Sequence, residues 1–193
     1  MLRRLYDRVM DLAGHRHAEP ALAGVAFIES SVFPIPPDVM LMPMAYAHPK
    51  RAFRYAAVAT VASVLGGLLG YAIGFFLFET VGRAILEFYG FSEKFETFAL
   101  NYNEHGEAIV FFAGLTPFPF KVITIASGVT GLALLPFLAA SIAARGLRFF
   151  LVCALIYWFG PPVREFVERH LGWVTLIFAI LLVGGFVAAG YLL

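Results

Sequence analysis

Charged side chains are scarce in this sequence. Only 14% of its 193 residues are Asp, Glu, Lys or Arg, and 61% are hydrophobic, whereas soluble domains are about 25% charged and about 45 to 50% apolar. The mean hydropathy is positive. So much apolar surface requires a lipid environment, and we therefore expect an integral membrane protein.

Several other features are missing, and each absence excludes a class of function. The net charge of +1 leaves no basic surface for nucleic acid. Cys153 is the single cysteine, so the chain forms no internal disulfide. His15 and His17 alternate with Arg16, which would repel a metal ion. No nucleophile-and-base pattern and no glycine-rich phosphate loop occur, so we expect neither an enzyme nor a cofactor.

Residues 1–19 do not resemble a signal peptide, because Arg3 and Arg4 are followed by mixed polar residues rather than by an apolar stretch. Apolar side chains recur instead at helical spacing, with charged side chains opposite them. They are Leu2, Leu5, Tyr6, Val9 and Met10. This pattern predicts an amphipathic helix that lies on the membrane surface.

Three segments are long enough to cross about 30 Å of hydrocarbon, which takes about 20 apolar residues. Residues 55–78 and 171–193 contain no charged side chain. The third segment, 135–160, contains Arg145 and Arg148. A lipid-facing arginine there would cost at least about 2.5 kcal/mol, so we expect both to face the protein interior or an aqueous cavity.

Spacing within the spans indicates what their faces contact. Arg145 and Arg148 are three residues apart, so they share one face of a helix. An alternative is a helix that begins later, near Phe149, and leaves both arginines at the membrane interface. In the first span, small residues recur at four-residue spacing, which predicts close packing against another helix. They are Gly66, Gly70 and Gly74, with Gly67 beside them.

Two further apolar segments, 21–47 and 108–134, contain charge and proline. The charged residues are Glu29 and Asp38 in the first segment and Lys121 in the second. The prolines are Pro34, Pro36, Pro37 and Pro43 in the first segment and Pro117 and Pro119 in the second. Proline disrupts a helix, and broken backbone at membrane depth is tolerated only where protein or water satisfies it. We therefore expect two re-entrant hairpins, each with a proline tip.

The distribution of charge orients the chain in the membrane. If the first hairpin enters and leaves on one side, the N-terminus and the basic residues of 50–54 share that side, which the positive-inside rule makes cytoplasmic. Residues 79–107 then lie outside, and they carry six glutamates against Arg83 and Lys94. Amphipathic patterning over 85–100 predicts short interfacial helices in this loop. The C-terminus is expected outside as well.

The two proline hairpins form an internal repeat. Residues 34–38 (PIPPD) match residues 117–121 (PFPFK) one for one, and an apolar span follows each. The chain is thus one all-α, polytopic membrane domain over 1–193, with a hairpin and a span at 20–78 and again at 108–160. Because the hairpins enter from opposite sides, the copies are inverted, as in many secondary transporters whose broken helices form the substrate site.

Ionisable side chains in apolar surroundings form the candidate site: Glu29, Asp38, Lys121, Arg145 and Arg148. Charge at membrane depth is costly and therefore indicates function. The two carboxylates are suited to load and release a proton, and the three basic groups are suited to bind a phosphate headgroup. The alternative is a purely structural role, such as an ion pair between Asp38 and Lys121 that holds the two tips together.

These residues resemble the DedA family, also called VTT or SNARE-associated Golgi proteins. The resemblance covers about residues 20–165 and rests on an acid at Glu29, a Pro-x-Pro, a second acid at Asp38, and a second proline hairpin with Lys121. It implies two opposed re-entrant hairpins and a role in moving lipids between leaflets. The tip residues that it implies are Pro34, Pro36, Pro117, Pro119 and Gly128.

The second hairpin departs from the family pattern. Family members have arginine, then proline three residues on, then arginine again. Here Gly114 stands three residues before Pro117, and Lys121 stands near the position of the second arginine. This sequence is similar to the divergent YqaA-like branch, and the missing arginine leaves the substrate and the proton coupling open.

We expect a lipid transporter, either a flippase or a scramblase, in the bacterial inner membrane. Its expected partners are a phospholipid or a polyprenyl phosphate such as undecaprenyl phosphate, and protons if transport is coupled. Two other classes stay open, namely a non-transporting membrane scaffold or assembly factor and an exchanger of small ions or protons. The sequence supports no particular oligomeric state, although it allows a homodimer.

Overall fold

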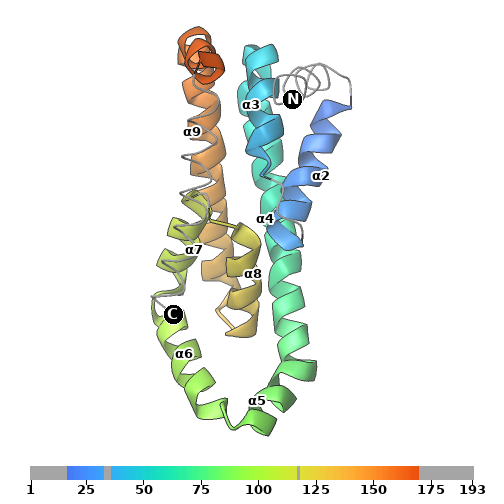
Figure 1. The fold of residues 1–193 in the computed structure, drawn as a ribbon, viewed down its shortest axis with the longest axis vertical. Helices are drawn as coiled ribbons and strands as arrows, with labels where there is room; N and C mark the ends of the chain where they lie inside the picture. The colour runs from blue at the N-terminus through green and yellow to red at the C-terminus, as the bar shows by residue number, and fades with distance from the viewer. Residues whose placement is uncertain (1–16, 33–35, 117, 170–193) are drawn as a thin grey trace.

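The computed structural model describes residues 17–32, 36–116 and 118–169, with side chains up to residue 160. Every regular element in this part of the chain is a helix (Figure 1), as the sequence predicts. The expected surface helix falls mostly on residues 1–16 and the expected last span on 171–193, and both lie outside the described residues. Ala18 and Glu19, which the prediction places in the surface helix, instead begin α2.

The helices are joined by short turns. In chain order they are α2 (Ala18–Ser31), α3 (Asp38–Ala47), the 3-10 turn η1 (Pro49–Arg51), α4 (Ala52–Leu77), the π-helical turn η2 (Phe78–Gly82), α5 (Arg83–Tyr89), α6 (Ser92–Glu104), α7 (Gly106–Leu115), α8 (Phe120–Val129) and α9 (Leu134–Arg169). α9 bends at Phe159, where the backbone angles are not helical. The helices expected within 79–107 are α5 and α6.

Two helical stretches are long and apolar enough to cross a membrane, Pro49–Tyr89 and Leu134–Gly160. At about 1.5 Å per residue, the 26-residue α4 is about 39 Å long, which exceeds the roughly 30 Å of a hydrocarbon layer. The 10-residue helices α3, α7 and α8 are each about 15 Å long. The chain thus combines long helices with helices that are less than half as long.

The order of helices occurs twice, in the register found in the sequence. When Pro34 is superposed on Pro117, the start of α3 falls on Lys121, just after α8 begins, and the start of α4 falls on Leu135, just after α9 begins. In Figure 1, α4 descends and α9 rises beside it, while α2 descends and α7 rises toward the middle of the molecule. The two copies therefore run in opposite directions.

The small-residue face of α4 is the surface on which the two broken helices pack. A side-chain carbon added at Gly66 would overlap the carbonyl group of Phe27 in α2, and one added at Gly74 would overlap that of Ile125 in α8. Between them, Gly70 contacts both α2 and α8. The predicted packing face is confirmed, and it brings one helix of each copy against the same span.

The pair α5–α6 is attached to the end of α8. The two helices meet at Gly90, whose φ of 68° is a left-handed value that glycine adopts without strain. In α6, the hydroxyl of Tyr102 lies 3.0 Å from that of Ser127, and the amide of Asn103 donates a 2.8 Å hydrogen bond to the carbonyl of Thr130. Burial raises the pKa of Tyr102, so its hydroxyl stays protonated and can donate to Ser127.

The close approach at Gly66 predicts a specific loss of stability. Gly66→Ala should lower the free energy of unfolding by about 1 to 3 kcal/mol, because the added methyl group meets backbone, which cannot move aside. Thermal unfolding of the purified protein in detergent measures the effect. Gly24→Ala in α2 is the matched control, since nothing lies within 4 Å of the added carbon, and it should be neutral or stabilising. Equal midpoints for the two variants would contradict the packing described.

Candidate functional site

The first helix break leaves carbonyl groups at the end of α2 without helical partners. The ammonium group of Lys121 donates a 3.0 Å hydrogen bond to the carbonyl of Val32, the residue that caps α2. The hydroxyl of Thr124 lies 3.1 Å from the carbonyl of Ser30 and 2.9 Å from that of Lys121, so it can donate to either. Both donors belong to α8, so the second copy completes the broken end of the first.

The second break is completed in a similar way from α9. Nη1 of Arg148 donates to the carbonyls of Leu115, at 3.4 Å, and of Thr116, where α7 ends. Val32 and Leu115 are equivalent positions in the repeat, so equivalent ends of the two copies each receive a cation. A positive charge at a helix C-terminus is favourable because it interacts with the helix dipole.

Arg145 and Glu29 form a deeply buried ion pair. Nη2 of Arg145 lies 2.8 Å from Oε2 of Glu29, and the two side chains are 3% and 9% exposed. Nε of Arg145 donates to Oγ of Ser63 at 2.7 Å, and Oγ of Ser30 donates to Glu29 at 3.1 Å. The serine hydroxyls are 2.7 Å apart, and since Ser30 has already used its proton, Ser63 donates to Ser30. We call this set the buried ring; it joins α2, α4 and α9.

The guanidinium group of Arg145 also lies between two aromatic rings. Its Cζ atom is 5.0 Å from the ring centre of Phe120 and 4.6 Å from that of Phe149, distances at which a cation is attracted to the ring face. Arg145 and Arg148 both lie well inside α9, which begins at Leu134. The alternative of a helix that begins near Phe149 is therefore wrong.

Arg148 and Asp38 form the second ion pair of the site. Nη2 of Arg148 lies 2.7 Å from Oδ2 of Asp38, and the side chains are 15% and 16% exposed, so this pair is less enclosed than the buried ring. Nε of Arg148 and Oδ1 of Asp38 are themselves buried and have no hydrogen-bond partner among the described residues. Unpaired buried polar atoms are costly. A bound ligand that accepts a hydrogen bond from Nε of Arg148 and donates one to Oδ1 of Asp38 would therefore be stabilised here.

The structure joins four of the five ionisable candidates in two ion pairs and places Lys121 at the end of α2. An ion pair between Asp38 and Lys121 is not formed, because Asp38 bonds to Arg148 while Lys121 bonds to a backbone carbonyl. Within the described residues, Lys121 has no acidic partner. With all five groups ionised, three positive charges face two negative ones, and the surplus charge is that of Lys121.

The proline turns lie where the sequence predicts, with one exception among the tip residues. Pro36 precedes α3 and Pro119 precedes α8, while Pro34 and Pro117 lie outside the described residues. Gly128 is not at a tip. It lies in the last turn of α8, where an added side-chain carbon would overlap the carbonyl of Tyr71. The prediction is wrong at this residue because the whole of α8 separates it from the break.

Three residues of the site escaped the sequence analysis, namely Ser30, Ser63 and Phe120. A signal existed for the serines, since Ser63 is a polar residue in a charge-free span and Ser30 adjoins Glu29, and polar side chains in such helices bond across to neighbours. Phe120 carried no signal, because the chain has 21 phenylalanines and nothing local distinguishes this one as a partner of an arginine on another helix.

Comparison with known families agrees with this architecture. A family model described as the VTT domain matches residues 35–158. The chain belongs to the VTT domain family. The match begins at the first proline turn and ends near the bend in α9, so it includes Asp38, Lys121, Arg145 and Arg148. The DedA resemblance drawn from the hairpin residues is therefore confirmed.

Two relatives are similar over nearly their whole length. An uncharacterized protein of Haemophilus influenzae is 38% identical over 181 residues, which are 92% of this chain and 93% of the relative. An uncharacterized protein of Histophilus somni is 40% identical over 180 residues, 91% of this chain and 93% of the relative. No solved structure matches the chain significantly. Membership of the VTT domain family and the two long apolar helices together identify a membrane protein.

The buried ring should be the main electrostatic support of the VTT domain. Glu29→Gln should lower the free energy of unfolding by about 3 to 5 kcal/mol, because it leaves the charge of Arg145 buried and unpaired. The double variant Glu29→Gln, Arg145→Met should recover a large part of that loss. Chemical unfolding of each variant in detergent measures both effects.

The control for this test is a carboxylate that is 26% exposed and pairs with an exposed arginine. Glu19→Gln breaks the pair with Arg54, whose side chain is 67% exposed, and should cost less than about 1 kcal/mol. If Glu29→Gln were no more costly than Glu19→Gln, the buried ring would not support the fold.

Proposed function

We propose that this protein moves lipids with an anionic phosphate group between the two leaflets of a membrane, through the place where the broken helices meet. The observation that carries the proposal is the bonding of Lys121 and Arg148 to backbone carbonyls. A phosphate oxygen is a stronger partner for either cation than a neutral carbonyl, because both donor and acceptor are then charged. A lipid headgroup can therefore replace the carbonyls without leaving the cations unpaired.

The lengths of the helices support a site near the middle of the membrane. In this proposal, α2–α3 and α7–α8 are re-entrant hairpins that enter from opposite sides, and residues 171–193 add a third span. Helices of about 15 Å reach about half of a 30 Å layer, so hairpins from opposite sides meet at its centre. Lys121 and Arg148 lie at that meeting point, which is where transporters built from inverted repeats bind their substrates.

The two ion pairs have different parts in the proposed cycle. The pair of Arg145 and Glu29 is enclosed and bonded to Ser30 and Ser63, so it holds α2, α4 and α9 in place. The pair of Arg148 and Asp38 is more open, and each member retains an unused polar atom. Asp38 therefore competes with the headgroup for Arg148, and protonation of Asp38 would release Arg148 to the lipid. Any coupling of lipid transport to protons would depend on this carboxylate.

Transport can be measured directly after reconstitution into liposomes. Leaflet exchange of labelled phospholipids and of undecaprenyl phosphate should be followed with and without a proton gradient. Lys121→Ala should reduce the rate roughly tenfold or more, because a charge-assisted contact to phosphate is lost. Asp38→Asn should abolish any dependence on the proton gradient, because an amide cannot take up and release a proton as a carboxylate does.

The matched control is Lys94→Ala, which removes an exposed lysine of α6 outside the site and should leave exchange unchanged. Failure of the protein to exchange any lipid would contradict transport and favour a scaffold. Ion flux without lipid exchange would favour an exchanger of small ions. Normal exchange in Lys121→Ala and Asp38→Asn would retain transport but discard the proposed site.

The proposed topology has its own test. In a Cys153→Ala background, a cysteine introduced by Thr97→Cys in α6 should react with an impermeant maleimide from outside intact cells. A cysteine introduced by Lys50→Cys in η1 should react only after the membrane is opened, because η1 and α6 lie at opposite ends of α4. Labelling of both from the same side would contradict the inverted arrangement.

A further inference from the structure

A second polar site lies at the far end of α8 from Lys121. A cavity of about 430 Å³ opens between the end of α4, the helices α5 and α6, and the turn that follows α8. Its lining residues are Phe75, Phe78, Glu79, Arg83, Leu86, Glu87, Ser92, Phe95, Glu96 and the segment 128–131. None of the five ionisable residues of the candidate functional site lines it, so the cavity is separate from the site proposed for transport.

The charge of this cavity is negative. Three carboxylates line it, those of Glu79, Glu87 and Glu96, against the single guanidinium group of Arg83. Arg83 is already engaged, since its Nη2 atom lies 2.8 Å from Oε1 of Glu79. Glu87 and Glu96 form no ion pair with any described residue. These charged side chains are exposed to water, and a ligand that enters the cavity meets a net negative charge, which favours a cation over an anion.

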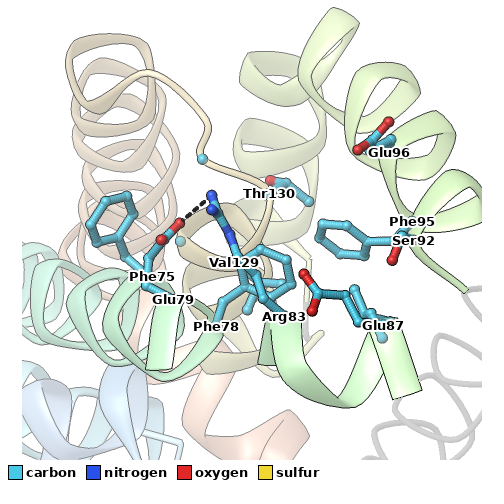
Figure 2. A pocket seen from close by; sticks show the side chains of 13 residues that line it. Phe75, Phe78, Glu79, Arg83, Glu87, Ser92, Phe95, Glu96, Val129 and Thr130 are labelled. Carbon is cyan, nitrogen blue, oxygen red and sulfur yellow. Dashed lines mark hydrogen bonds and ion pairs between the residues drawn. The ribbon is translucent and has the colours of Figure 1, made fainter. Parts of the chain in front are cut away.

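The walls of the cavity are aromatic. Phe75, Phe78 and Phe95 line it, and the rings of Phe78 and Phe95 stack with their centres 4.6 Å apart. Figure 2 shows the ring of Phe95 between Glu87 and Glu96. Aromatic faces attract organic cations, which carry apolar carbon beside their charge. This combination of carboxylates and rings matches an organic cation better than a hydrated inorganic one.

A metal ion does not fit the same residues. Among the described residues, no three His, Cys, Asp or Glu side chains converge closely enough to hold a metal. In Figure 2, Glu79 reaches toward Arg83, while Glu87 and Glu96 lie on separate helices around Phe95. The three carboxylates are thus spread around the cavity and do not converge on one point. This arrangement suits a bulky cation better than a metal ion.

We propose that this cavity binds an organic ammonium group, with Glu87 and Glu96 as its counterions and Phe75, Phe78 and Phe95 as its apolar walls. Arg83 is an internal competitor, because it already supplies a cation to Glu79 within the cavity. The ammonium group can belong to a soluble amine or to the headgroup of an aminophospholipid. The proposal does not depend on the transport of anionic lipids, since the two sites share no residue.

The soluble form of the ligand is tested with spermidine. The full chain in an uncharged detergent is titrated with spermidine at constant ionic strength, and the rise of the thermal midpoint with concentration gives an apparent Kd. Glu87→Gln combined with Glu96→Gln should raise this Kd roughly tenfold, since each exposed charge pair contributes a few-fold. Arg83→Gln should lower the Kd, because it removes the internal competitor.

The lipid form is tested by native mass spectrometry. The protein is purified from an equimolar mixture of phosphatidylethanolamine and phosphatidylglycerol, and the retained lipids are counted. A preference for phosphatidylethanolamine that the Glu87→Gln, Glu96→Gln variant loses assigns the ligand to the lipid headgroup. A response to spermidine with no lipid preference assigns it to soluble amines, and either result supports the proposal.

Glu93→Gln is the matched control for both experiments, because it removes an exposed carboxylate of α6 that does not line the cavity, and it should change neither result. Equal effects of Glu93→Gln and of the double variant would overturn the proposal, since only overall charge would then matter. A stabilisation by Mg²⁺ as large as that by spermidine, lost in the same double variant, would also overturn it.

Discussion

Broken helix ends inside an apolar bundle must find partners for their carbonyl groups, and the arrangement of this protein depends on how that requirement is met. At membrane depth no water would satisfy these groups, and each unpaired group costs several kcal/mol. The end of α2 is completed by Lys121 and Thr124 of α8, and the end of α7 by Arg148 of α9. The first copy of the repeat therefore relies on donors from the second copy, whereas the broken end of the second copy is completed by its own span, α9.

The same contacts explain why the ionisable groups differ in their surroundings. The buried ring closes on itself, because Arg145, Glu29, Ser30 and Ser63 use one another as donors and acceptors. It requires the close packing of α2 on α4, which the glycine at Gly66 permits. Arg148 must serve both a carboxylate and a helix end, and its pair with Asp38 remains open and incompletely bonded. A deeply buried pair and a more open pair thus lie one helical turn apart on α9.

Charge is also separated along the length of the molecule. The basic residues of 50–54 lie at one end of α4, and the acidic cavity lies at the other, beside α5 and α6 (Figure 1). The positive-inside rule interprets the first as a cytoplasmic end. In the proposed topology the acidic end faces outward, where its carboxylates would meet organic cations from outside the cell. Gly128 belongs to this end, since it lines the cavity and packs against α4 instead of forming a hairpin tip.

The sequence by itself determined the apolar character of the chain, the two proline breaks and their common register, the glycine face of α4 and the five ionisable residues that could not face lipid. Each of these follows from a single residue or from a fixed spacing between residues. The cost of burying a charge or the periodicity of a helix is therefore enough to predict it. Which ionisable side chains pair with one another is different, because it depends on the distances between helices. Asp38 bonds to Arg148 rather than to Lys121 because the end of α2 takes up the lysine. That competition, the serines of the buried ring and the aromatic walls of the acidic cavity were decided only when the tertiary structure set the helices side by side.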